Sequence, residues 1–127
     1  MTRMTLAAKS ALACAGALLL ALPAAAQPNG GPDCFLTRDI RNHTVAGDHT
    51  MYIDVNGRAV YRVDMSNNCL AAVTSSDPYV LKDRGGMGRI CHKLDFDISV
   101  HGTRCIVDNM TRLTPAQVAA LPRGVRP

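Results

Sequence analysis

The chain has 127 residues and a formal net charge of +4 at pH 7, half of which comes from Arg3 and Lys9 near the N-terminus. The remaining charge of about +2 is far below the dense positive surface that nucleic-acid binding requires, so composition excludes that class of partner. All ten acidic residues are Asp and none is Glu, which removes a good helix former and favours strands, turns and loops.

The N-terminal segment has the three parts of a cleavable export signal. Arg3 and Lys9 form the basic start, an apolar run extends from about Ser10 to Leu22, and Ala24-Ala25-Ala26 forms the small-residue exit. The apolar run is shorter than the roughly 20 residues that a helix needs to cross a bilayer. We therefore predict that residues 1–26 are a signal peptide, and that the mature chain has no transmembrane segment and is periplasmic or secreted.

Five cysteines are present, and the first of them, Cys14, lies inside the apolar run. Acylation of Cys14 would leave most of that run after the cleavage site, so a lipoprotein is the less favoured alternative. The other four form an even set in a short exported chain, which is typical of disulfides, and no C-x-x-C spacing supports a zinc site. Three pairings are open, and we prefer Cys34 with Cys105, joining the ends of the domain, and Cys69 with Cys91.

The mature chain has the length of one domain. Residues 27–33 are rich in Pro and Gly and are predicted to be a flexible lead-in. A single β-rich domain is expected over residues 34–121, followed by a disordered tail over residues 122–127, which begins at Pro122.

The clearest local structure is a hairpin over residues 50–65. Apolar residues occupy every second position from Met51 to Val55, and again from Ala59 to Met65. A two-residue turn at Asn56-Gly57 would put these two sets on opposite faces, so we predict a three-residue loop with Gly57 in the left-handed conformation. The other face is expected to be solvated; it carries Tyr52, Asp54, Arg58, Arg62 and Asp64.

Further strands are predicted over residues 43–46, 79–81, 95–100 and 103–107, with a turn at His101-Gly102-Thr103. A short helix from Pro115 to about Leu121 is indicated by Thr114 as N-cap, with Gln117 completing a capping box. The predicted fold is therefore mostly β (α+β): a small antiparallel sheet, sandwich or partly open barrel, held by disulfides, with one C-terminal helix.

Metal binding is one functional hypothesis, because neutral imidazole is a common ligand. The four histidines are irregularly spaced, and the candidate ligands are His92 and His101, with Asp95 or Asp97 close to them in the sequence. Cys91-His92 lacks the first cysteine of a covalent haem motif, so no haem or other cofactor is predicted.

Catalytic motifs are missing from the sequence. No Gly-x-Ser-x-Gly elbow supports a hydrolase triad, and five aromatic residues with no Trp argue against a stacking platform for sugars or bases. We therefore expect a protein that is not an enzyme and has no catalytic residues.

A set of short motifs is distributed along the mature chain. They are Cys34-Phe35, Ile40, Asp48-His49-Thr50, Tyr61, Cys69-Leu70, Ile90-Cys91, Cys105-Ile106-Val107 and Leu113. Together they resemble a family of small exported proteobacterial proteins known as a domain of unknown function. The resemblance implies a β-rich fold with the four cysteines as its skeleton, and it implies no activity. This chain has His92 where that family often has Gly, so the turn there is expected to differ.

These observations lead to two functional hypotheses. The first is a non-catalytic binding or accessory domain of the bacterial envelope, whose partner is another envelope protein or a ligand. The alternative is a periplasmic metal-binding protein that uses its histidines.

Overall fold

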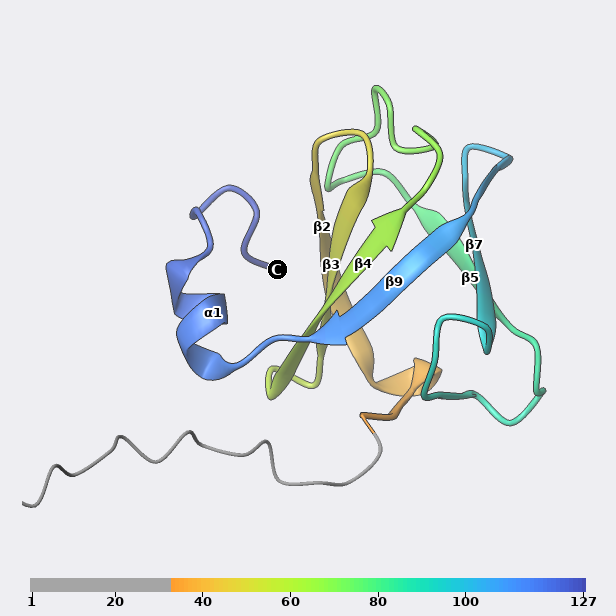
Figure 1. The fold of residues 1–127 in the computed structure, drawn as a ribbon, viewed down its shortest axis with the longest axis horizontal. Helices are drawn as coiled ribbons and strands as arrows, with labels where there is room; N and C mark the ends of the chain where they lie inside the picture. Colours follow the sequence, from red (N-terminus) through yellow and green to blue (C-terminus); the bar gives the residue numbers. More distant parts are fainter. Residues whose placement is uncertain (1–32) are drawn as a thin grey trace, which may run out of the picture.

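The structure, a computed structural model, describes residues 33–127. The predicted signal peptide over residues 1–26, Cys14 and nearly all of the predicted lead-in lie outside the described residues. The described chain is mostly β, with three antiparallel sheets, one short α-helix and two disulfides, so the predicted fold class is confirmed. Figure 1 shows the strands in two splayed groups, with the helix set apart from them on the left.

The largest sheet has four strands in the order β2-β3-β4-β9. They are β2 (Ile40–Ala46), β3 (Thr50–Val55), β4 (Ala59–Met65) and β9 (Val107–Arg112). A second sheet has the order β5-β7-β8, formed by β5 (Tyr79–Asp83), β7 (Phe96–Val100) and β8 (Thr103–Cys105). A two-stranded pair joins β1 (Phe35–Leu36) to β6 (Arg89–Ile90), and a 3₁₀ turn (Thr37–Asp39) leads from β1 into β2.

The predicted hairpin forms as β3 and β4. Val55 pairs with Ala59, which leaves a three-residue loop in which Asn56 and Gly57 both have a positive φ. The backbone N–H of Gly57 donates to Asp54 Oδ1 at 3.0 Å. Ile53 lies opposite Tyr61, as the three-residue loop requires. The sequence prediction of the loop length and of one apolar face is therefore confirmed.

That apolar face forms the centre of the core. It packs against the inner side chains of the three-stranded sheet and against β1 and β6. The ring of Phe35 lies 4.7 Å from the ring of Tyr61, so β1 is joined to the four-stranded sheet by an aromatic contact. The most deeply buried side chains are Tyr61, Phe96, Met51, Ile53, Leu70, Ile90, Ile98, Val63, Val100 and Cys105.

Part of the reverse face of the four-stranded sheet is covered, while Arg58 and Arg62 are exposed, as predicted. Tyr52 is buried and not solvated, together with Thr44 and Val60. Figure 1 shows the helix and the C-terminal segment on this side of the sheet, and the Thr44 hydroxyl donates to the carbonyl of Val125. Residues 122–127, predicted as a disordered tail, form backbone hydrogen bonds among themselves and make this contact with Thr44.

The helix α1 (Pro115–Ala120) begins where the sequence predicts. Thr114 is the N-cap and accepts from the backbone N–H of Gln117, while the Gln117 side chain accepts from the N–H of Thr114. The predicted capping box is confirmed. In the part of the chain that the structure describes, no helix is long and apolar enough to cross a membrane.

The two larger sheets are joined by one nearly continuous strand. β8 ends at Cys105 and β9 begins at Val107, so the chain leaves the three-stranded sheet and enters the four-stranded sheet across Ile106. On the opposite side, β2 and β5 are edges that do not pair with each other, so residues 33–127 form no closed barrel. The backbone N–H of Val45 donates to Ser75 Oγ at 2.9 Å across this opening.

The two disulfides are Cys34–Cys91 and Cys69–Cys105. The prediction that all four cysteines form disulfides is confirmed for this structure. The predicted pairing of Cys34 with Cys105 and of Cys69 with Cys91 is wrong. Each bridge instead follows a strand contact that the sequence did not reveal.

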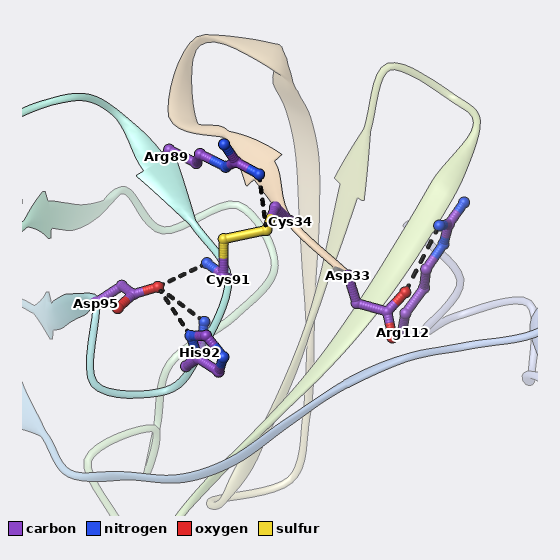
Figure 2. Close-up of a disulfide and its surroundings, with 7 residues drawn as sticks. All are labelled: Asp33, Cys34, Arg89, Cys91, His92, Asp95 and Arg112. Atoms are coloured by element: carbon purple, nitrogen blue, oxygen red, sulfur yellow. Dashed lines mark hydrogen bonds and ion pairs between the residues drawn. A yellow bond between two sulfur atoms is a disulfide. The ribbon is translucent and has the colours of Figure 1, made fainter. Parts of the chain in front are cut away.

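The first bridge is explained by the short β1–β6 pair. Cys34 precedes β1 and Cys91 follows β6, so antiparallel pairing brings their Cα atoms to 4.0 Å (Figure 2). The second bridge joins the segment after β4 to β8, where Cys105 faces the core opposite Ile98. The first bridge therefore reinforces the β1–β6 pair, and the second joins the three-stranded sheet to the segment that follows β4.

Candidate functional site

The outer face of the three-stranded sheet is the surface with the most unusual composition. Inner and outer side chains alternate along each strand, so the burial of Phe96, Ile98 and Val100 turns the intervening residues outward. The register aligns Val80 of β5 and Arg104 of β8 with Ser99, and it aligns Lys82 with Asp97. We call this surface, together with the residues that border it, the outer face. Its residues are Val80, Lys82, Arg84, Lys93, Leu94, Asp97, Ser99, Arg104 and Ile106.

Several large apolar side chains are exposed on this face. Within residues 33–127, four large hydrophobic side chains are exposed, and three of them belong to the outer face: Val80, Leu94 and Ile106. Their exposed fractions are 63, 68 and 57 %. Single exposed hydrophobic residues need no explanation, but three on one small face, of which Leu94 and Ile106 line the same hollow, favour an interaction surface.

Asp97 organises the charge on the outer face. Arg84 donates to it from Nε at 2.9 Å and from Nη2 at 2.7 Å, and Arg104 donates from Nη2 at 2.8 Å. The hydrogen bonds from the Arg84 side chain, with those from Arg104, lower the pKa of Asp97 to about 2. One carboxylate therefore holds two guanidinium groups side by side, and a net positive charge remains.

This arrangement predicts an acid-dependent loss of stability. The folded-state pKa of Asp97 lies below its ordinary value of 3.8, so the unfolded chain binds the proton more readily. The stabilisation is present above pH 4 and is lost as the pH falls from about 4 to about 2. The Asp97→Asn variant should therefore show a weaker dependence of its unfolding free energy on pH in this window. Urea unfolding at pH 5, 4, 3 and 2.5 measures this, and equal slopes for the variant and the parent would contradict it.

A hollow of about 160 Å³ lies in the fork where β9 diverges from β7. We call it the fork hollow. Its cationic residues are Arg84, Lys93 and Arg104, and its one acidic residue is Asp97. The rest of the lining is apolar and consists of Leu94, Phe96, Cys105, Ile106 and Val107.

The backbone at the fork is fixed by a side chain from another segment. Asn67 Oδ1 accepts from the N–H of Ile106 at 2.8 Å, and Asn67 Nδ2 donates to the carbonyl of Arg104 at 3.0 Å. The N–H of Ser66 donates to the carbonyl of Ile106 at 2.9 Å. These bonds occupy the free edge of β8 and hold Ile106 with its side chain in solvent. The hydrogen bonds of the Ile106 backbone therefore keep its side chain exposed.

A lysine connects the segment before β7 to β9 at the fork. Lys93 Nζ donates to the carbonyl of Asp108 on β9 and lies 3.9 Å from the carboxylate oxygen of the same residue. On and around the outer face there are four cationic side chains, Lys82, Arg84, Lys93 and Arg104, and two carboxylates, Asp97 and Asp108. The local charge is positive.

The histidines of the metal hypothesis lie beside different carboxylates. His92 Nδ1 is 3.5 Å from Asp95, whose pKa is lowered by backbone N–H donors of Cys91 and His92 (Figure 2). His101 Nε2 is 3.2 Å from Asp77, whose pKa is lowered first by the N–H of Thr74. Within residues 33–127, no three His, Cys, Asp or Glu side chains are grouped so that they could hold a metal ion.

Sequence reasoning named Asp97 only as a neighbour of a histidine, and it did not single out the residues around it. The available signal was the register. If Cys105 faces the core, Ile106 is an apolar residue at an outward position, and the same holds for Val80 between Tyr79 and Leu81. Two such outward apolar residues on neighbouring strands of one sheet favour a contact surface.

Comparisons of this chain with family models, with curated proteins and with solved structures find no match. The resemblance to a family of small exported proteins therefore stays a prediction.

Proposed function

We propose that this protein is an exported, non-catalytic binding domain, and that its partner, another protein of the bacterial envelope, docks on the outer face of the three-stranded sheet. One observation carries this proposal. Val80, Leu94 and Ile106 expose their apolar side chains on a surface whose charged residues are mostly cationic. Burying such residues against a partner is favourable by roughly 25 cal/mol for each Å² removed from water.

The rest of the architecture supports a rigid binding surface. β7 and β8 are short strands held by a tight turn, and the Cys69–Cys105 bridge fixes the end of β8. A rigid surface loses little conformational entropy when it binds, which favours affinity. Two disulfides in a small domain are typical of an oxidising compartment, and this favours the periplasm or the cell exterior as the site of action.

Site-specific photo-crosslinking in the source organism tests this proposal. A photoreactive phenylalanine analogue replaces Val80 or Ile106 on the outer face, and Arg58 in the exposed β3–β4 loop is the matched control. We expect one discrete crosslinked product of the same mass from positions 80 and 106, and none from position 58. Crosslinking at all three positions alike, or at none of them, would show that the outer face is not the docking surface.

A further inference from the structure

The fork hollow indicates the chemistry of the partner. Resting on the proposed function, we infer that the partner inserts a carboxylate flanked by an apolar side chain into the fork hollow, with Arg84 and Arg104 as the carboxylate-binding groups. The partner segment is thus acidic and apolar, and its charge is complementary to that of the outer face.

The two arginines keep hydrogen-bonding capacity for a ligand. A guanidinium carries five N–H donors, of which Asp97 engages two on Arg84 and one on Arg104. The side chains remain accessible, with exposed fractions of 45 % for Arg84 and 69 % for Arg104. Asp97 holds both groups in place before a ligand arrives, so a second carboxylate finds paired donors whose geometry is already set.

The apolar part of the hollow favours a protein carboxylate over other anions. The hollow, of about 160 Å³, has room for a carboxylate with a small neighbouring group. Phe96 and Val107 line the hollow, and Leu94 and Ile106 add exposed apolar surface. A free phosphate would leave this apolar surface uncovered. An acidic residue beside a leucine would bind the arginines and also cover the apolar surface.

We assign this carboxylate to an Asp or Glu side chain within a segment, because an acidic residue beside an apolar one contacts both parts of the lining; the C-terminus of the partner is the alternative source. Nuclear magnetic resonance titration of the ¹⁵N-labelled mature protein with three short peptides distinguishes them. The probes are acetyl-Leu-Asp-Leu-amide, acetyl-Leu-Leu with a free carboxylate, and acetyl-Leu-Asn-Leu-amide as the neutral control. We expect saturable shifts of the amide signals of Leu94, Arg104 and Ile106 with acetyl-Leu-Asp-Leu-amide, and none with the neutral peptide. Binding of acetyl-Leu-Leu alone would assign the carboxylate to a C-terminus and contradict the proposed source.

A pair of matched variants tests whether the arginine is the binding group. Arg104→Gln should weaken binding of the acidic peptide by about threefold to fivefold, because it removes one exposed charged donor. Arg62→Gln is the control, since Arg62 makes a comparable ion pair with Asp64 on the other sheet, and its binding should equal that of the parent. Raising the NaCl concentration from 50 to 500 mM should also weaken binding to the parent.

Several results would overturn this inference. They are equal shifts with the neutral peptide, shifts that map outside the fork hollow, no binding of acetyl-Leu-Asp-Leu-amide, or unchanged affinity in the Arg104→Gln variant. If crosslinks form at positions 80 and 106 while neither acidic peptide binds, the outer face is a docking surface for a partner without the carboxylate. If those crosslinks are absent, the proposed function itself fails.

Discussion

Replacing Cys69 and Cys105 together by Ala is expected to lower the free energy of unfolding by about 4 kcal/mol. The bridge closes a loop with a sequence separation of 36, for which the chain-entropy model gives a stabilisation of this size. Both sulfur atoms also lie in the core, since Cys69 and Cys105 are buried. A loss of this size is a large part of the 5–15 kcal/mol that stabilises a typical domain. Urea unfolding followed by circular dichroism gives the value.

The Cys34–Cys91 bridge provides a control that separates the stabilisation by loop closure from the stabilisation by core packing. Cys34–Cys91 has a sequence separation of 57, so the chain-entropy model gives it a slightly larger contribution, also about 4 kcal/mol. Cys34 and Cys91 are only partly buried, however, so their replacement by Ala removes less core packing. We therefore expect the Cys69/Cys105 double variant to be the less stable of the two. A Cys69/Cys105 variant as stable as the parent would refute a structural role for that bridge.

Local features of this fold could be predicted from the sequence, because the residues that determine them are neighbours. The β3–β4 loop follows from the positions of apolar residues around Asn56-Gly57, and only a three-residue loop puts them on one face. The start of α1 follows from Thr114 and Gln117, which complete each other's hydrogen bonds within one turn. In both cases the physical cause lies within a few residues.

Features that depend on distant segments could not be predicted in this way. Tyr52 is buried beside Thr44, its partner in the β2–β3 register, and the Thr44 hydroxyl donates to a carbonyl 81 residues away. The disulfide pairing depends on the β1–β6 pair, whose strands have two residues each and show no alternation. Four cysteines allow three pairings, and only these long-range contacts select one.

The candidate site falls between these two cases. Val80, Asp97, Ser99, Arg104 and Ile106 lie on strands that the sequence predicts, but Arg84, Lys93 and Leu94 lie outside those strands, and the sequence does not show that these residues meet. Arg84 and Arg104 converge on Asp97 because β5, β7 and β8 are neighbours and because the chain bends away into β9 after Ile106. The fork hollow forms where the chain passes from β8 in one sheet to β9 in the other. No periodic pattern in the sequence predicts that point.

Phe35→Ala is expected to destabilise the domain by about 3–5 kcal/mol, the range for deleting a buried phenylalanine. Phe35 is 5 % exposed, and its ring contact with Tyr61 adds to the transfer free energy that is lost. It is also the residue that follows Cys34, so its ring anchors the β1–β6 pair and the Cys34–Cys91 bridge to the four-stranded sheet. Urea unfolding of the oxidised protein measures the loss.

Two further variants make this prediction specific to the ring contact. Phe35→Leu keeps most of the buried volume and loses the contact with Tyr61, so it should be destabilised less than Phe35→Ala. Val80→Ala removes an exposed side chain and should stay within about 0.5 kcal/mol of the parent. If Phe35→Ala were as stable as Val80→Ala, the β1–β6 pair would be held by its disulfide alone and would contribute little to the core. The burial of Phe35 against Tyr61 argues for the larger loss, because the disulfide fixes the two strands to each other and the aromatic contact fixes them to the sheet.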